Sequence, residues 1–287
     1  MGDASIIPTT LACQLAAKEV SSVLSADGPD ELLGGYDKYL SLAKKKALFG
    51  WLPKFAIPPA RYAMQSSLAA KVAKQLGMKN PANRLERFSF MLGAQEGELL
   101  KTNSMVFTPK ELAQLFKQPP VSLTTNFDAP LGKHLLENAM ALDFTTAALD
   151  AVLVKVNRAA TYAGIKNYEP VQNQALIEHF IRLPFNYKIN QGNKKYLLKQ
   201  VVHKYLPPEL MDRPKMGFGV PLIDWFKDDL KDYLLDYLNE ESLQKTGILN
   251  PEPVIKMRDN YLSGDSADIT KLWYLLVFML WWERWVG

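Results

Sequence analysis

Three carboxylates in one tight turn are the residues of this chain most suited to chemistry. Asp27, Asp30 and Glu31 lie in the segment Leu24 to Tyr36, directly after a short β-prone run at residues 20–24. In open α/β sheets, ligands bind in the crevice beyond the carboxyl ends of the strands. Carboxylates placed there can hold Mg²⁺, which proteins usually bind through one or two of them together with substrate phosphates. The turn therefore predicts a metal-phosphate site, and the alternative is a solvated turn, because Asp-Gly and Gly-Gly are ordinary turn dipeptides.

A second group of reactive side chains occurs in the segment Arg213 to Pro221. This segment combines two basic residues with two glycines, and prolines stand near both of its ends. Such a composition is typical of a mobile loop that closes on a charged substrate. Lys215 could neutralise charge on a phosphate or an acyl oxyanion, or it could transfer a proton. The alternative is a surface loop whose charges are solvated.

The composition is that of a globular protein. The chain has 287 residues, of which 48% are hydrophobic and 22% are charged, and this is enough to bury a sizeable core. The net charge of +4 is scattered, and Lys44 to Lys46 form the one run of three basic residues. Because such a run is usually a solvated helix face, we expect no nucleic-acid partner. Cys13 is the single cysteine, so disulfides within the chain and cysteine-based metal sites are excluded, and a cytoplasmic location is expected.

Neither a membrane anchor nor a histidine metal site is expected. The longest apolar run, Leu272 to Trp282, is too short to span a bilayer and indicates a buried terminal helix. The aromatic residues around Trp281 are assigned to the core. The first residues lack the basic and apolar regions of a signal peptide. The three histidines lie far apart in the sequence and are assigned no metal; they are His134, His179 and His203.

Helical periodicity dominates the rest of the sequence. Apolar residues recur at three- and four-residue spacing, which predicts helices at residues 9–19, 59–76, 83–92, 108–116, 131–156, 173–183, 194–205 and 271–285. Ser5 or Thr9 could cap the first of these, and Thr108 and Glu111 form a capping signature around Pro109. The stretch Lys117 to Asp128 indicates a connector. No second β run with period-two alternation follows Leu24, and a single strand cannot form a sheet. The sequence thus predicts a mostly helical fold with a remnant of a parallel α/β sheet.

Four segments, taken in order, resemble the synthetase domain of the asparagine synthetase family. Asp3 to Thr9 resembles the family's helix start G-D-x-S-x-I-P-T. Leu24 to Tyr36 resembles its signature L-S-G-D/E-G-x-D-E-L-F-G-G-Y, and Arg213 to Pro221 resembles its loop R-P-K-x-G-F-x-x-P. Residues 272–282 are similar to the family's closing helix. The resemblance covers essentially the whole chain, and it places these segments in the carboxyl-terminal part of the synthetase domain.

The resemblance implies a fold and an activity. The fold is a partial adenine-nucleotide α-hydrolase-like (HUP-type) synthetase domain. It is expected as a single domain over residues 1–287, with an α/β signature segment at 1–40 and a mainly helical part at 41–287. The activity is that of an ATP-dependent, AMP-forming carbon-nitrogen ligase of asparagine biosynthesis. Such a ligase uses Mg²⁺, forms an acyl-adenylate of aspartate and then reacts with ammonia.

The resemblance also implies roles for individual residues. Asp27 matches the acidic residue at the reacting centre, Lys215 matches the loop lysine that stabilises the transition state, and Asp30 matches a Mg²⁺ ligand on the pyrophosphate side. The residues expected to bind the nucleotide are Ser25, Gly28, Glu31, Gly34, Gly35 and Tyr36. The glycines permit close approach of the backbone to the ligand.

Several positions depart from the family pattern. The Gly-rich turn S-G-G-x-D-S, whose amides cradle pyrophosphate, does not occur in these 287 residues, and neither does the glutaminase with its nucleophilic cysteine. Asn157 and Ala160 replace the Asp and the Ser of the family's K-V-D-R-x-S motif. Lys166 and Tyr168 replace an acid and an arginine of the motif that follows. We therefore expect a partner polypeptide to supply the pyrophosphate loop and the glutaminase.

Three interpretations of the function stay open. The first is the amide ligase, completed by that partner. The second is a non-catalytic remnant that acts as a binding or regulatory module. The third keeps the ligase chemistry with a different carboxylate substrate, as in relatives that close lactam rings. Because a truncated sheet would expose an apolar edge, we also expect the isolated chain either to associate, for example as a homo-oligomer, or to be poorly soluble.

Overall fold

The structure, a computed structural model, describes residues 2–50, 52–78, 81–118, 132, 134–212, 217–264 and 268–287. The chain divides into two compact units. The first unit consists of residues 3–45 and 125–220, and the second consists of residue 2 with residues 46–124 and 221–287. Helix α3 (Asp37–Gly50) contains the point at which the chain passes from the first unit to the second. The single-domain interpretation of residues 1–287, with its division at residue 40, stays a prediction.

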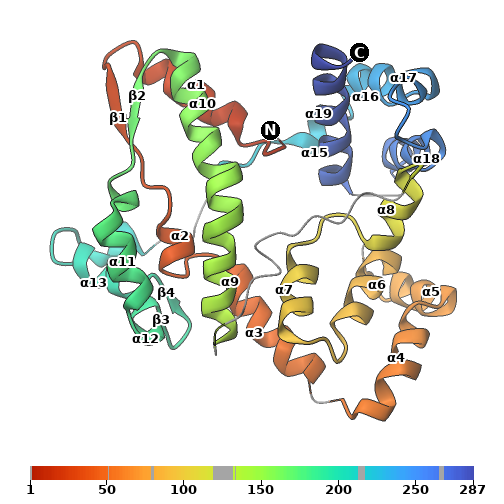
Figure 1. The fold of residues 1–287 in the computed structure, drawn as a ribbon, viewed down its shortest axis with the longest axis horizontal. Helices are drawn as coiled ribbons and strands as arrows, with labels where there is room; N and C mark the ends of the chain where they lie inside the picture. Colours follow the sequence, from red (N-terminus) through yellow and green to blue (C-terminus); the bar gives the residue numbers. More distant parts are fainter. Residues whose placement is uncertain are drawn as a thin grey trace. The chain divides into compact units, whose positions relative to one another are not determined.

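Helices make up most of the first unit (Figure 1). They are α1 (Ile6–Ala16), α2 (Pro29–Leu32), the first part of α3, α9 (Leu135–Asp143), α10 (Val154–Ala163), α11 (Gln174–Arg182), α12 (Phe185–Lys188), α13 (Tyr196–Val202) and α14 (Pro208–Met211). A π-helical segment, η3 (Phe144–Leu153), joins α9 to α10, and a 3-10 turn, η4 (Pro170–Gln172), precedes α11. A short antiparallel pair, β3 (Ile189–Asn190) and β4 (Asn193–Lys194), leads into α13.

A two-stranded parallel sheet positions the carboxylate turn. Strand β1 (Ser22–Leu24) pairs with β2 (Lys166–Tyr168), and Val23 lies opposite Asn167 in the register. The predicted remnant of a parallel sheet is confirmed, whereas the expectation that no second strand follows Leu24 is wrong. The reason is length, because three residues are too few to show a period-two pattern. The partner of β1 therefore comes from a segment far away in the sequence.

One face of this sheet packs against two helices. Val23 contacts a small core that consists of Cys13, Ala159, Ala160 and Ile165. Helices α1 and α10 pack side by side there (Figure 1), and the small side chains let them approach closely. Gly164, with a φ of +75°, ends α10 in the left-handed conformation and turns the chain into β2.

Apolar side chains remain exposed around the sheet. Leu24 on β1 is 75% exposed, and Leu11 and Leu15 on α1 are also exposed. Exposed apolar clusters of this kind often mark contact surfaces. The expected homo-oligomer and the expected partner polypeptide both stay predictions.

The second unit is also helical. Its elements are the remainder of α3, η1 (Lys54–Ala56), α4 (Ile57–Met64), α5 (Ser67–Gln75), α6 (Pro81–Met91), α7 (Glu96–Ser104), α8 (Pro109–Leu115), α15 (Leu222–Trp225), α16 (Lys231–Tyr237), α17 (Glu240–Lys245), α18 (Pro251–Leu262) and α19 (Ile269–Trp285). Its main core gathers apolar residues of α8 and of the helices after residue 220. Phe226, Leu234, Leu243, Val254 and Leu272 are completely buried in this core.

The largest differences from the predicted helix boundaries concern two helices. The helix predicted at 59–76 is two helices, α4 and α5, because Ser66 has an extended backbone and its hydroxyl accepts a hydrogen bond from the Ala69 amide at 3.1 Å. This bond caps a new helix. The helix predicted at 131–156 begins at Leu135 and continues through η3 to Ala163. Residues 119–131, which include most of the predicted connector, lie outside the described residues.

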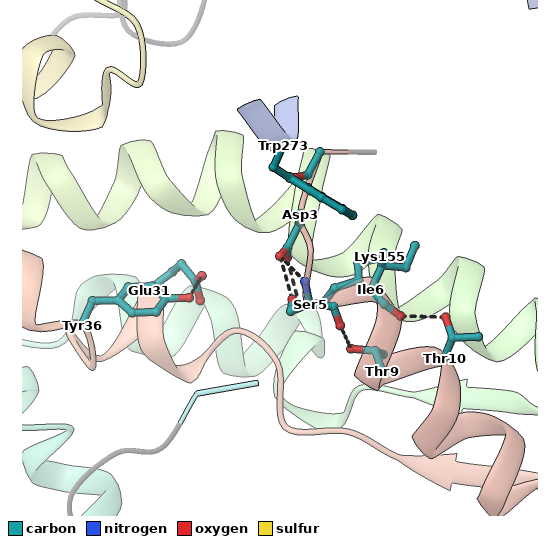
Figure 2. Close-up of polar contacts among 10 residues, drawn as sticks. Asp3, Ser5, Ile6, Thr9, Thr10, Glu31, Tyr36, Lys155 and Trp273 are labelled. Atoms are coloured by element: carbon teal, nitrogen blue, oxygen red, sulfur yellow. Dashed lines mark hydrogen bonds and ion pairs between the residues drawn. The ribbon is translucent and has the colours of Figure 1, made fainter. Parts of the chain in front are cut away.

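The start of α1 is fixed by Asp3. Its Oδ1 accepts hydrogen bonds from the backbone N of Ser5 at 2.9 Å and from the Ser5 hydroxyl at 2.7 Å (Figure 2). Lys155 of α10 donates to Ser5 Oγ at 3.0 Å and lies 3.3 Å from Asp3 Oδ2. The Thr9 hydroxyl instead donates to the Ser5 carbonyl at 2.7 Å. Ser5 is therefore the N-cap residue of α1, as one of the two predicted alternatives, but its side chain makes no capping hydrogen bond because its hydroxyl donates to Asp3.

The terminal apolar run forms α19, as the sequence predicted. Only one face of this helix is buried, however, and it includes Leu272, Leu275 and Leu276. Trp281 is 49% exposed and Trp285 is 70% exposed, whereas Phe278 is partly buried against the core, so the assignment of the aromatic residues around Trp281 to the core is only partly confirmed. None of the described helices is long and apolar enough to cross a membrane.

Candidate functional site

The carboxylate turn leaves β1 and enters α2 through Gly28. This residue has a φ of +104°, in the left-handed region that favours glycine, and it is the N-cap of α2. A Cβ at this position would collide with the side-chain amide of Gln172, whose Nε2 donates to the Asp27 carbonyl at 3.0 Å. The Ser25 amide donates to the Tyr168 carbonyl at 2.9 Å and extends the pairing of β1 with β2. The turn is thus fastened at the carboxyl ends of both strands.

Polar side chains of β2 and of the residue after it face this turn. Asn167 Nδ2 donates to Ser25 Oγ at 3.2 Å and to Glu169 Oε1 at 2.9 Å. Burial raises the pKa of Glu169, and the negative charge of Asp27 raises it further. Two carboxylates, Asp27 and Glu169, therefore share the crevice. The sequence alone does not single out Asn167 or Glu169, because their position depends on the pairing of β2 with β1.

Asp30 lies on the wall of a cavity of about 530 Å³. Its Oδ1 is 2.9 Å from Nζ of Lys195, and both side chains are partly exposed. Lys195 has a φ of +52°, which is uncommon for a residue other than glycine, and its amide donates to the Leu33 carbonyl at 3.2 Å. A Cβ on Gly35 would collide with both Asp30 and Lys195. The structure thus brings together two of the predicted site residues, Asp30 and Gly35, and adds a lysine.

Basic side chains line much of the rest of this cavity. They are Lys194, Lys199 and His203, from β4, α13 and the residue after α13. Each lysine of the wall meets a carboxylate of the same unit. The three ion pairs are Lys194 with Asp37, Lys195 with Asp30, and Lys199 with Asp212. The sequence predicts only a helix at residues 194–205, because nothing local indicates that α13 lies beside α2.

Glu31 lines a different cavity, of about 300 Å³, together with Glu137 and Lys188. Its side chain is 2% exposed, and the Tyr36 hydroxyl donates to Glu31 Oε1 at 2.7 Å (Figure 2). Burial raises the pKa of Glu31, and the charges of neighbouring aspartates raise it further. Burial and the bond to Glu31 also raise the pKa of Tyr36. The predicted nucleotide-binding residues are therefore divided between two surroundings, and their roles stay predictions.

The Glu31→Gln variant should be more stable than the wild type at pH 7. Because burial raises the pKa of Glu31 above its ordinary value of 4.5, the folded protein holds this proton more tightly than the unfolded chain does. The stability of the wild type therefore falls as the pH rises through 4.5 towards the raised pKa, whereas glutamine does not titrate and can still accept the Tyr36 bond. Urea unfolding at a series of pH values should show a difference in the free energy of unfolding between the variant and the wild type, and this difference should disappear towards about pH 4. Glu178→Gln, at an exposed position on α11, is the control, and a difference independent of pH would contradict the prediction.

A family model described as asparagine synthase matches residues 1–285. The chain belongs to the asparagine synthase family. The family assignment made from the sequence motifs is therefore confirmed. The predicted fold class is confirmed with it, since the chain is mostly helical, keeps a small parallel sheet and belongs to a family with the adenine-nucleotide α-hydrolase fold.

Three relatives from this family illustrate the similarity. Proteins of Mycobacterium bovis and Mycobacterium tuberculosis, both named "Putative asparagine synthetase (glutamine-hydrolyzing)", are 28% identical over 290 residues, which cover 98% of this chain and 42% of each relative. "Asparagine synthetase (glutamine-hydrolyzing) 1" of Bacillus subtilis is 24% identical over 287 residues, which cover 98% of this chain and 43% of that protein. The chain thus spans about two fifths of the length of these curated relatives. No solved structure is a significant match.

The remaining two residues of the asparagine synthase motifs are Lys215 and Gly34. Lys215 falls in residues 213–216, outside the described residues, so its role stays a prediction. Gly34 is described and has a φ of +69°, and a Cβ there would come within 2.7 Å of the Ile189 side chain. This glycine lets the chain turn tightly between α2 and α3, and it packs against β3. Its place in nucleotide binding is likewise a prediction.

Proposed function

We propose that this asparagine synthase family chain is the carboxyl-terminal part of an ATP-dependent, AMP-forming amide ligase. In the proposed reaction, ATP activates a side-chain carboxylate such as that of aspartate, pyrophosphate leaves, and ammonia displaces AMP from the acyl-adenylate. The proposal includes a second polypeptide segment that supplies the pyrophosphate loop and the glutaminase, because neither motif occurs in the 287 residues.

The Asp30–Lys195 pair is the observation that carries this proposal. A carboxylate and an ammonium held 2.9 Å apart on a cavity wall offer the two charges that a metal-bound pyrophosphate needs. A lysine is a usual point charge for phosphate groups, and a carboxylate is a usual Mg²⁺ ligand. Asp30 of this pair belongs to the turn that carries Asp27, at the sheet end where ligands of α/β proteins bind.

Asp30 fits a Mg²⁺ site that the substrate completes. The residues that the structure describes hold no group of three or more His, Cys, Asp or Glu side chains suited to a metal, and Glu31 lines the other cavity. Because Mg²⁺ is usually bound through one or two carboxylates plus substrate phosphates, one carboxylate on this wall is sufficient. When bound, the ion neutralises charge on the phosphates. Asp30 would hold it, and Lys195 would keep a further positive charge beside the leaving pyrophosphate.

The reacting centre is assigned to Asp27 and Lys215. Asp27 stands beyond the carboxyl end of β1, where it can orient an attacking amine and accept its proton. Lys215, by its motif, would stabilise negative charge on the transferred group. Ser25, Gly28, Gly34 and Gly35 would form the surface against which the nucleotide lies, and Glu31 with Tyr36 would support that surface from the buried side.

A second candidate keeps the ligase chemistry and changes the carboxylate substrate. Glu169 shares the crevice with Asp27, while Lys166 and Tyr168 stand at positions where the family has an acid and an arginine. Two carboxylates in one crevice attract a cationic group. A substrate with an additional amino group near its carboxylate would suit this arrangement. Pyrophosphate release measured over carboxylic acids with and without such a group distinguishes this candidate from asparagine formation.

Isothermal titration of Mg-ATP tests the ligase proposal. The 287-residue chain is titrated alone and after mixing with a purified polypeptide that carries the family's S-G-G-x-D-S loop. We expect binding in the mixture above that of the added polypeptide alone, and none to the chain alone, because each polypeptide supplies one wall of the phosphate site. If the chain adds no binding in the mixture, the ligase proposal is overturned. If the chain binds equally well alone, the need for the partner is overturned.

A further inference from the structure

Asp212 lies against Lys199 and His203 at the α13 side of the cavity that holds Asp30. Lys199 Nζ is 3.0 Å from Asp212 Oδ1, and His203 Nε2 is 3.5 Å from Asp212 Oδ2. Lys199 and His203 are four residues apart on α13 and its C-cap, a spacing that puts both side chains on one face of a helix. Both also line the cavity wall, so this face of α13 is directed at the cavity.

The His203 side chain is poorly satisfied by this arrangement. Its Nε2 atom is buried and has no hydrogen-bond partner among the described residues, since the contact with Asp212 is long for a hydrogen bond. A buried polar atom without a partner costs free energy that a suitable ligand atom would recover. The hydrogen bond and charge of Lys199 hold the pKa of Asp212 below its usual range, so the aspartate is an anion at neutral pH.

We propose that Lys199 and His203 form an anion subsite, which the Asp212 carboxylate occupies in the ligand-free protein and which a phosphate group takes by displacing Asp212. A phosphate carries several acceptor oxygens around one centre, so it can meet the lysine ammonium and the histidine N–H together. The aspartate satisfies only the lysine well. The subsite requires neither Mg²⁺ nor ATP hydrolysis, and it therefore stands independently of the proposed ligase activity.

The cost of displacing Asp212 is small. Its side chain is 41% exposed, and exposed ion pairs contribute little to stability because water solvates the separated charges almost as well. The incoming anion also benefits from Lys194 and Lys195 on the same wall. These two lysines are paired with Asp37 and Asp30, as Lys199 is with Asp212, but the subsite at Lys199 also has beside it the buried His203 Nε2, which has no hydrogen-bond partner among the described residues. A ligand with two phosphates is the most sensitive probe.

Titration of inorganic pyrophosphate in Mg²⁺-free buffer at pH 7 tests the subsite in the full chain. The Asp212→Asn variant should bind pyrophosphate about fivefold more tightly, because the internal competitor is removed. Lys199→Gln and His203→Gln should each weaken binding, and in the Lys199→Gln background the gain from Asp212→Asn should disappear. The imidazole NMR signals of His203, assigned by their loss in His203→Gln, should shift during the titration.

Glu178→Gln is the matched control for Asp212→Asn. It removes the same charge and breaks an ion pair with Arg182 on exposed α11, away from the cavity-lining residues, and it should leave pyrophosphate affinity unchanged. The proposal is overturned by unchanged affinity in Asp212→Asn, by a gain that persists without Lys199, or by His203 signals that do not move. Loss of Mg-ATP binding in the reconstituted mixture would not produce these results, so the two proposals fail separately.

Discussion

Replacement of Lys195 by Met should lower the rate of ATP–pyrophosphate exchange about 100-fold in the chain reconstituted with a polypeptide that carries the S-G-G-x-D-S loop. The Lys195 ammonium is 2.9 Å from Asp30 and faces the cavity proposed for the phosphates. Methionine keeps most of the volume of the side chain and removes the charge. The leaving pyrophosphate would then lose a cation that is already in place before the reaction, and this kind of preorganised charge contributes strongly to catalysis.

Lys194→Met is the control for this prediction. It removes the same charge from the neighbouring residue, whose ammonium pairs with the highly exposed Asp37. Because that charge stands on β4 at a solvated carboxylate, we expect an effect smaller than fivefold on the exchange rate. Equal losses in the two variants would mean that the exchange depends on the general charge of the wall. An unchanged rate in Lys195→Met would remove the central support for the proposed phosphate site.

The same reconstituted assay separates a ligase from a non-catalytic remnant. Lys215→Ala should abolish most of the amide product if Lys215 stabilises the transition state, as its motif implies. Lys204→Ala, at an exposed residue after α13, should have no effect. Product formation that is unchanged in Lys215→Ala would favour the interpretation of the chain as a binding or regulatory module.

Elements defined by neighbouring residues could be predicted from the sequence. Helix α8 is an example, because Thr108, Pro109 and Glu111 indicate its start within four residues. In the structure, Glu111 Oε2 accepts the Thr108 amide at 2.8 Å, and the Thr108 hydroxyl accepts the Glu111 amide at 3.2 Å. Strand β2 could not be predicted in this way, because three residues carry no periodicity and its partner β1 lies far away in the sequence.

The candidate site likewise combines residues that a local sequence pattern indicates with residues that only tertiary contacts bring together. The carboxylate turn could be recognised because Asp27, Gly28 and Asp30 are consecutive or nearly so, and a turn of this composition is a local property. Lys195 could not be recognised, since only the packing of the first unit brings the start of α13 to Asp30. Glu169 required the pairing of two strands. Local signals therefore identify one wall of a site, and the opposing wall is specified by tertiary contacts.

Glu111 of α8 also forms an ion pair with the buried Lys271, and the loss of this pair should have a large effect on stability. The Glu111→Ala variant should unfold with a free energy about 3 kcal/mol lower than that of the wild type. Glu111 Oε1 is 2.6 Å from Nζ of Lys271, which is 2.8 Å from Asp268 Oδ2 and has a side chain only 5% exposed. The substitution leaves this buried ammonium with one carboxylate partner and also removes the capping bond to Thr108. Urea unfolding followed by tryptophan fluorescence measures the change, because the described tryptophans all lie in the second unit.

A second substitution identifies the source of the loss. If the buried ammonium is responsible, adding Lys271→Met to Glu111→Ala should recover part of the stability, since methionine fills a similar volume without a charge that needs a partner. Glu241→Ala on α17 breaks an ion pair with Lys245 in which both side chains are exposed, and it should cause no measurable change. A double variant that is less stable than Glu111→Ala alone would show that Lys271 stabilises the unit without Glu111. In that case the capping bond of α8, rather than the buried ion pair, would account for the effect of Glu111→Ala.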